Sequence, residues 1–319
     1  MNFKYTASRL LAIGGICFSL SSLSATDEHL FAPWVPLDFD VSMQTKAFSD
    51  AIRITKQVIG IDGEKLLECF RNLYQLNSLE KMQPQKELKI PKIIHQIWLG
   101  SPLPEAFKKY MATWINSHLQ GGWSYKLWTD EDMKTFKLYN QKYYDETDSF
   151  GVKSDLLKWE LVYRFGGVYI DMDYECLRPL DIFHYTYDFY TGIQPLDTQF
   201  LQLGAALFGG VPGHPILKHC IESIGDDWHL KGAPTKSGPV HFTKSFYVTA
   251  GKNGSKDIAV PASYFYPLGC RQNKLKRKEW IEQGAYAVHH WAKSWMPAEF
   301  RTPEFQHLNN DHLVQTWNK

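Results

Sequence analysis

The sequence lacks several features that would assign it at once to a particular class of protein. Its 319 residues include only five cysteines, and none of them forms a CxxC pair or a cysteine–histidine spacing typical of structural zinc. The net charge of +1 argues against a general nucleic-acid binder. Beyond the first 25 residues, no apolar run approaches the roughly 20 residues that a membrane helix needs. We find no internal repeat and no low-complexity tract, so the composition is that of an ordinary globular protein.

The first 25 residues differ from the rest of the chain. Lys4 and Arg9 precede an apolar run over residues 10–20, and the small residues Ser24 and Ala25 end the segment. This order is typical of a secretory signal peptide. A short type II membrane anchor is the alternative interpretation. We therefore expect export of the chain, with a membrane-anchored protein of the Golgi lumen as the alternative.

The remaining chain divides into two parts. Residues 26–89 are expected to form an N-terminal arm and two helices, because apolar residues recur at helical spacing within 47–79. Residues 90–319 form the main domain, in which strand-like and helix-like patterns alternate. Strands are predicted at 93–98, 124–128, 168–170, 187–193, 205–208, 264–267 and 287–291, and helices at 104–119, from 129, and at 152–165, 215–224 and 240–249. This alternation favours an α/β fold with a mostly parallel sheet flanked by helices.

Two carboxylates end an apolar segment in the middle of the chain. Residues 168–170 are Val, Tyr and Ile, and Asp171, Met172 and Asp173 follow directly. Residues two apart in a strand point to the same side, so both carboxylates can face one site. Two like charges behind a buried strand are costly unless a cation lies between them. Because Mg²⁺ and Mn²⁺ take carboxylate oxygens as ligands, we predict that Asp171 and Asp173 hold a divalent metal.

Three further side chains are candidates for the same site. Trp98 ends the strand at 93–98, at the edge where ligands collect in open α/β sheets, and can stack on a nucleobase or a sugar. Asp155 and Lys158 lie on the helix that precedes the two carboxylates, and they can reach a sugar or ribose hydroxyl and a phosphate. Each of these residues taken alone is an ordinary core or surface residue. Together they indicate a site for a phosphorylated sugar compound.

Four segments of the main domain resemble one family of enzymes. They are IPKIIHQIWLG at 90–100, YKLWTDED at 125–132, SDLLKWELVYRFGGVYIDMD at 154–173 and HHWAKSW at 289–295. These segments resemble the DXD-motif sugar transferases of glycosyltransferase family 32, typified by the yeast initiating α-1,6-mannosyltransferase. More distantly they resemble the glucosyltransferase domains of large clostridial toxins. The resemblance implies a GT-A fold, a Rossmann-like sheet that binds a nucleotide sugar with Mn²⁺ or Mg²⁺, and transfer with retention of configuration.

Site residues follow from the resemblance position by position. Asp171 and Asp173 are expected to be catalytic through the metal and the donor. Trp98, Asp155 and Gly167 are expected among the donor-binding residues. Lys158 also belongs to this group, although an arginine stands at its position in many relatives. Lysine keeps the charge but loses the planar fork that holds two oxygens at once.

The segment HHWAKSW is expected to act as a lid over the donor. Ser294 and Trp295 are expected to donate hydrogen bonds to the leaving diphosphate. Histidine is a competent metal ligand, but His289 and His290 alternate across a strand, so at most one of them faces the site. Of the two, we favour His290 as the third metal ligand.

The predicted function is therefore a metal-dependent glycosyltransferase. It moves a hexose from a UDP- or GDP-sugar to a glycan, lipid or protein acceptor. It has no nucleic-acid partner, and it meets a membrane only if the leader is retained as an anchor. The alternatives are a non-catalytic carbohydrate-binding protein and, less favoured, a phosphatase that also ends a strand with a DxD sequence. An exported enzyme with a nucleotide-sugar donor would find that donor in the Golgi lumen or, as an effector, inside a host cell.

Overall fold

The computed structural model describes residues 34–82, 84–271, 277–294, 301 and 305. The predicted leader at residues 1–25 and the predicted donor-binding residue Trp295 lie outside these residues and stay predictions. Within the described ranges, none of the helices combines the length and the apolar character needed to cross a membrane.

A six-stranded sheet in the order β2-β1-β3-β6-β5-β7 forms the centre of the described structure. Its strands are β1 (Ile93–Ile97), β2 (Ser124–Trp128), β3 (Gly167–Ile170), β5 (Phe189–Ile193), β6 (Leu203–Gly210) and β7 (Asp257–Val260). Strand β6 is antiparallel to β3 and to β5, whereas the pairs β1–β2, β1–β3 and β5–β7 are parallel. Five strands therefore run in one direction, which confirms the predicted mostly parallel sheet.

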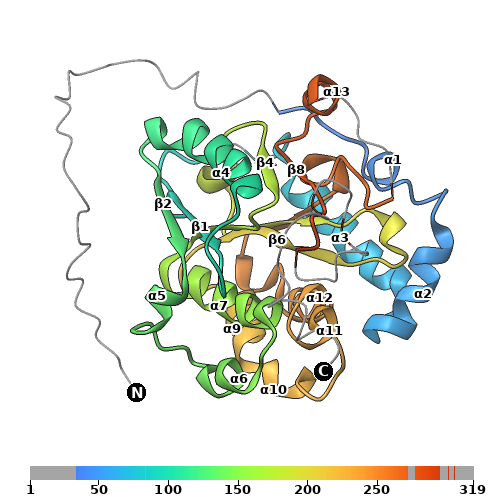
Figure 1. The fold of residues 1–319 in the computed structure, drawn as a ribbon. Coiled ribbons are helices and arrows are strands. Elements are labelled where there is room, and N and C mark those ends of the chain that lie inside the picture. Colours follow the sequence, from blue (N-terminus) through green and yellow to red (C-terminus); the bar gives the residue numbers. More distant parts are fainter. Residues whose placement is uncertain (1–33, 83, 272–276, 295–300, 302–304, 306–319) are drawn as a thin grey trace.

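Helices cover both faces of this sheet (Figure 1). Helix α4 (Glu105–His118) connects β1 to the edge strand β2, and α7 (Phe150–Phe165) returns from β2 past β1 to β3. The two connections run in opposite directions along the sheet, so right-handed crossovers place α4 and α7 on opposite faces. Helices α9 (Pro215–Glu222) and α12 (Pro239–Thr249) lie on the same side as α7, and α4 packs against the strand β4 (Tyr174–Cys176). Strand β4 pairs with β8 (Ala287–His289) in a separate two-stranded sheet.

The N-terminal part contributes α1 (Phe39–Met43), α2 (Ser49–Ile59) and α3 (Gly63–Asn77). Helix α3 packs on β7, and α2 packs on α3 and α12. The two helices predicted within 47–79 are thus confirmed, and their apolar faces join the main core.

The shorter helices are α5 (Asp130–Met133), α6 (Gln141–Glu146), α8 (Asp181–Thr186), α10 (Ile224–Asp227), α11 (Ala233–Lys236) and α13 (Arg277–Glu282), with 3-10 turns η2 (Leu119–Gly121), η3 (Leu196–Thr198), η4 (Lys252–Gly254) and η5 (Ala262–Tyr264).

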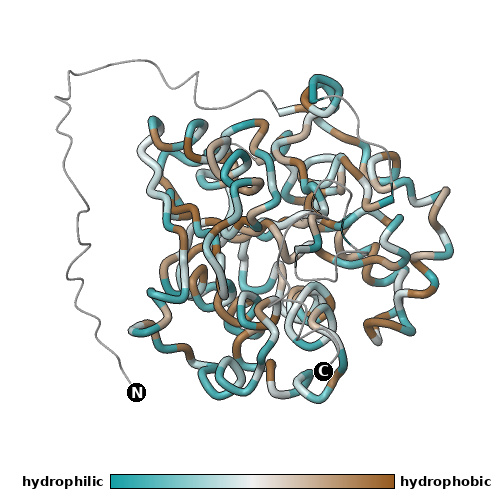
Figure 2. Tube along the Cα trace, viewed as in Figure 1, coloured by the Kyte–Doolittle hydropathy of each residue, from teal (hydrophilic) through white to brown (hydrophobic). Residues whose placement is uncertain are grey.

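Trp159 of α7 joins the helical layer to the sheet. Its ring is fully buried and lies 4.8 Å from the ring of Phe208 in β6 and 4.9 Å from that of Phe242 in α12. Burial of one large apolar side chain stabilises a fold by about 2–3 kcal/mol. The Trp159 Nε1 also donates to the backbone oxygen of Ser237 at 3.0 Å, which fixes the segment before α12 against α7. Figure 2 shows the apolar segments running through the centre of the fold, and polar segments on the outer helices.

Two local predictions are wrong. Residues 264–267 do not form a strand, because the backbone turns there: η5 begins after Pro261, and the Tyr266 N–H donates to the Ala262 oxygen at 2.6 Å. The edge strand is β7 instead, which the sequence pattern did not reveal. The helix α7 begins at Phe150, earlier than predicted, because the Ser149 side chain accepts a hydrogen bond from the Val152 N–H.

Candidate active site

A pocket of about 470 Å³ opens at the edge of the sheet where the parallel strands end. Trp98 follows β1, and Asp171 and Asp173 follow β3. Asp155 enters from α7. Residues that follow β8, including Ser294, complete the wall. The tertiary structure therefore brings together residues that are nearly 200 positions apart in the chain.

Asp171 and Asp173 reach the pocket because the chain turns after β3. The Asp171 N–H donates to the Ala206 oxygen of β6 at 2.8 Å, which continues the pairing of β3 with β6 by one residue. The Tyr174 N–H then donates to the Asp171 oxygen at 3.2 Å and closes a tight turn before β4. Both carboxylates therefore face one pocket from a short and well-fixed segment, as predicted.

The two carboxylates have different surroundings. The Tyr169 hydroxyl donates to Asp171 Oδ1 at 2.6 Å, and burial raises the pKa of Asp171. Burial also acts to raise the pKa of Asp173. This effect is outweighed by His289 and by the Ala292 N–H, which donates to Asp173 Oδ2 at 2.7 Å, so the pKa of Asp173 is lowered. A nearby cation would favour the ionised form of both groups.

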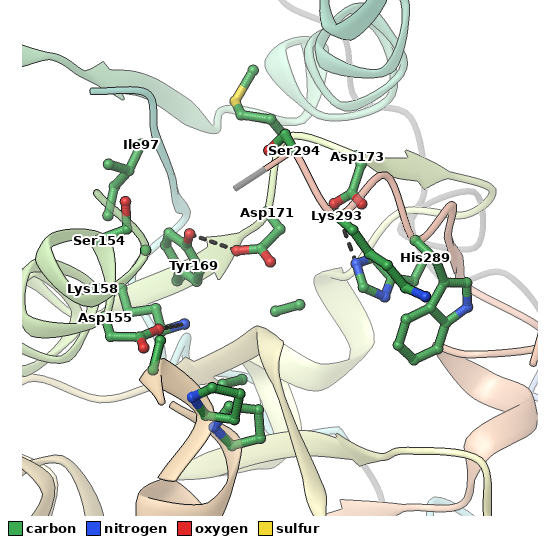
Figure 3. A pocket seen from close by; sticks show the side chains of 18 of the residues that line it. Ile97, Ser154, Asp155, Lys158, Tyr169, Asp171, Asp173, His289, Lys293 and Ser294 are labelled. Carbon is green, nitrogen blue, oxygen red and sulfur yellow. Dashed lines mark hydrogen bonds and ion pairs between the residues drawn. The ribbon is translucent and has the colours of Figure 1, made fainter. Parts of the chain in front are cut away.

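His289 is the histidine that faces the carboxylates. Its Nε2 lies 3.2 Å from Asp173 Oδ1 (Figure 3). His289 is opposite Tyr174 in the β4–β8 pair, which carries its side chain to the end of the turn that contains Asp173. The preference for His290 is therefore wrong. The His290 ring stacks on Tyr110, and its Nε2 lies 3.1 Å from Glu175 Oε2, on the other side of the strand.

Asp171, Asp173 and His289 fit a divalent metal by their chemistry and position. One ligand atom from each residue lies within 4.8 Å of the others. Among the described residues, the buried His289 Nδ1 has no hydrogen-bond partner. Two carboxylates and an imidazole are a donor set that Mn²⁺ accepts. Within the described parts of the chain, no other group of three histidine, cysteine or acidic side chains has this metal-ligand spacing.

Asp155 and Lys158 form an ion pair inside the pocket. Lys158 Nζ lies 2.5 Å from Asp155 Oδ1, and the Ser237 hydroxyl donates to Asp155 Oδ2 at 2.9 Å. Lys158 is only 4% exposed, and its ammonium lies 5.3 Å from the centre of the Tyr169 ring. In Figure 3 this pair lies on one side of Asp171, and Asp173 and His289 lie on the other. The site therefore presents fixed charges of both signs along one wall.

Trp98 and Ser294 also line the pocket. The Trp98 indole packs on Phe107, with 5.0 Å between ring centres, and its Nε1 donates to the Ser101 hydroxyl at 3.1 Å. This bond fixes the plane of the ring at the pocket wall. An aromatic face held in this way is suited to stacking on a base or a sugar.

Gly167 is placed differently from the prediction. It does not line the pocket and is the first residue of β3, buried against β1. Its φ is +94°, and a Cβ atom there would lie 2.4 Å from the backbone oxygen of Ile93. A side chain cannot be accommodated, so glycine is needed for the close approach of two strands. The structure therefore does not bring Gly167 to the pocket, and its role as a donor-binding residue stays a prediction.

Several pocket residues were not singled out from the sequence. They are Tyr169, Gln194, Gln202, Arg271 and Lys293. Tyr169 lies two residues before Asp171 on the same face of the strand, a signal that could have been used. Lys293 lies within the segment HHWAKSW but was not itself singled out. Gln194, Gln202 and Arg271 belong to connections without periodicity or a short motif, so only the folded chain shows their position.

Comparisons with known proteins agree with this site. Residues 104–190 match the family described as "Glycosyltransferase sugar-binding region containing DXD motif". Inositol phosphoceramide mannosyltransferase 3 of Schizosaccharomyces pombe is 35% identical over 140 residues, which are 42% of this chain and 37% of that protein. The initiation-specific alpha-1,6-mannosyltransferase of Saccharomyces cerevisiae is 25% identical over 180 residues, 52% of this chain and 36% of that protein. The solved structure of the PaToxG glycosyltransferase is 15% identical, with a TM-score of 0.45 over 60% of this chain and 79% of that chain.

Residues 104–190 thus match the sugar-binding region of glycosyltransferases that carry a DXD motif, and the predicted resemblance to this family is confirmed. The aspartates of this motif are Asp171 and Asp173, within the matched residues. The chain spans less than half the length of the three inositol phosphoceramide mannosyltransferases that it matches.

Proposed function

We propose that this protein is a metal-dependent glycosyltransferase that moves a hexose from a nucleotide sugar to a glycan, lipid or protein acceptor. The observation that carries the proposal is the cluster of Asp171, Asp173 and His289 inside a pocket that also contains a fixed indole, that of Trp98. A carbohydrate-binding protein without turnover has no need for two adjacent carboxylates and an imidazole in its pocket. The family of the chain supports the same activity.

Each side chain has a distinct task in this proposal. Trp98 stacks on the base, and Asp155 accepts hydrogen bonds from ribose or sugar hydroxyls. Lys158, which is ion-paired with Asp155, offers its ammonium to a phosphate oxygen. Asp171, Asp173 and His289 hold Mn²⁺ or Mg²⁺, which when bound neutralises the charge that develops on the diphosphate leaving group. Ser294 donates to the same diphosphate.

The relatives indicate which donor to test first. The names of the relatives given above describe the transfer of mannose, in one group to inositol phosphoceramide. We therefore propose mannose as the first hexose to test and a lipid with a phosphorylated sugar-alcohol headgroup as the first acceptor. UDP-glucose and other UDP-sugars belong in the same panel, because donor choice depends on the shape of the pocket around the sugar.

Thermal unfolding with a panel of nucleotide sugars tests the proposal. We expect at least one UDP- or GDP-sugar to raise Tm in the presence of Mn²⁺ and to lose this effect in EDTA. A ligand at 100 times its Kd stabilises a protein by about 2.7 kcal/mol, which is a shift of several degrees. The proposal fails if no nucleotide sugar raises Tm with metal. A shift caused by free hexoses without metal would instead indicate a carbohydrate-binding protein.

The two histidines provide a matched pair of variants. We expect His289→Ala to weaken Mn²⁺ binding about tenfold or more, because it removes a ligand atom next to Asp173. We expect His290→Ala to leave Mn²⁺ affinity unchanged and to lower stability modestly, since it removes the stacking on Tyr110. Calorimetric titration with Mn²⁺ measures both affinities. Loss of metal binding in His290→Ala but not in His289→Ala would contradict this assignment.

A further inference from the structure

A pair of glutamines lines the pocket beside the residues discussed above. Gln194 directly follows β5, and Gln202 directly precedes β6. Each residue is 7% exposed, and Gln202 Nε2 donates to Gln194 Oε1 at 2.7 Å. Strand β6 also pairs with β3, so the glutamines lie at the same edge of the sheet as the two aspartates. Buried carboxamides in a pocket are well suited to recognise a polar ligand.

The backbone around Gln202 is fixed from three directions. The Leu201 N–H donates to the Thr55 hydroxyl of α2 at 2.9 Å, and the Leu203 N–H donates to the Thr243 hydroxyl of α12 at 2.9 Å. The Gln194 N–H donates to the Gln202 backbone oxygen at 3.0 Å. These bonds hold the carboxamide of Gln202 at a defined place, which recognition of one ligand atom requires.

The carboxamide of Gln202 is not satisfied within the described chain. Its Oε1 is buried and has no hydrogen-bond partner among the described residues. A buried polar atom without a partner destabilises the folded protein, so a ligand that supplies the missing bond gains affinity. A hydroxyl can supply it whichever way the carboxamide is turned, because a hydroxyl both donates and accepts. The nearby Ala205 and Ala206 carry only methyl groups and also line the pocket, which leaves room for a ring.

We propose that Gln194 and Gln202 form the subsite that recognises a hydroxyl of the transferred hexose and thereby selects the donor sugar. This inference rests on the proposed function and adds to it the residues that determine specificity. A site built to hydrogen-bond a hydroxyl strongly rejects a sugar in which that hydroxyl is absent, because the buried amide is then left unpaired.

Variants that remove the carboxamides test the proposal. Gln202→Met and Gln194→Met keep a similar volume, and Gln199→Met is the matched control, since Gln199 is exposed on the connection between the two. Calorimetry in Mn²⁺ compares UDP, GDP, UDP-glucose and GDP-mannose. We expect Gln202→Met to lower the affinity for the preferred nucleotide sugar about tenfold. The matching nucleoside diphosphate should bind as it does to the unaltered protein, and Gln199→Met should change neither affinity.

Nucleotide sugars that lack one hydroxyl complete the test. We expect the unaltered protein to lose about tenfold in affinity for one such deoxy analogue, and Gln202→Met to show no further loss for it, because the same bond is already absent. If Gln202→Met binds the nucleotide sugar with unchanged affinity, this inference is overturned and the proposed function is not. So does an equal loss for nucleotide sugar and nucleoside diphosphate, which would show a structural effect. If the unaltered protein binds no nucleotide or nucleotide sugar, the proposed function itself fails, and this inference fails with it.

Discussion

Asp173→Asn is expected to lower hexose transfer about 100-fold or more, because a bound metal ion contributes several kcal/mol to the stabilisation of developing charge. The fold should be retained. Asparagine keeps a carbonyl oxygen in place of Asp173 Oδ2, which accepts the 2.7 Å hydrogen bond from the Ala292 N–H. What it loses is the negative charge beside His289. Turnover of the preferred nucleotide sugar in saturating Mn²⁺ measures the effect.

Asp145→Asn is the matched control for this variant. Asp145 is exposed on α6 and does not line the pocket, so the same chemical change there should leave turnover at the level of the unaltered protein. The Mn²⁺-dependent rise in Tm should disappear in Asp173→Asn and persist in Asp145→Asn. Turnover in Asp173→Asn equal to that of the control would mean that the carboxylate cluster is not the catalytic centre.

Gly167→Ala is expected to destabilise the protein by about 2–5 kcal/mol. The positive φ of +94° accounts for about 1–2 kcal/mol of this loss in a residue with a side chain. The remainder comes from a Cβ atom placed 2.4 Å from the Ile93 oxygen, because β1 and β3 must separate to admit it. Domains are stable by only about 5–15 kcal/mol, so this is a large part of the total. Urea unfolding measures the change.

Gly122→Ala separates the two contributions. Gly122 has a φ of +78°, and a Cβ atom there meets nothing within 4 Å, so only the backbone strain of about 1–2 kcal/mol is expected. The folded fraction of Gly167→Ala should bind nucleotide sugar with unchanged affinity, since Gly167 does not line the pocket. A Gly167→Ala protein as stable as Gly122→Ala, but with weakened donor binding, would instead support the predicted role of Gly167 in donor binding.

Local patterns were sufficient for much of the fold. The alternation of strands and helices from β1 to β3 follows from apolar periodicity and from glycines and prolines at the ends. These elements appear as predicted, apart from the earlier start of α7. The weakest predictions fell on the later part of the domain. Strand β7 has only four residues, and its buried Asp257 bonds to His214 and Ser255, a contact that no local pattern reveals.

The candidate site divides in a similar way. Asp171 and Asp173 could be found because a paired charge behind an apolar strand is costly without a partner, and this cost is visible in the sequence. The choice between His289 and His290 could not be made from the sequence. Successive side chains of a strand point to opposite faces, which shows that the two histidines point apart but not which one points into the site. The pairing of β8 with β4 decides that. Gly167 could be singled out from the sequence, but the reason that a glycine is needed there is the close approach of β3 to β1.

The sequence by itself determined the parallel α/β arrangement, the resemblance to a family and the two carboxylates, because each depends on periodicity or on residues close together in the chain. Tertiary structure alone decided which distant residues complete the site. For example, the backbone on either side of Gln202 donates hydrogen bonds to hydroxyls from α2 and α12, which are far apart in the sequence. The approach of such segments depends on how whole layers pack, and packing is a property of the complete core rather than of any local pattern.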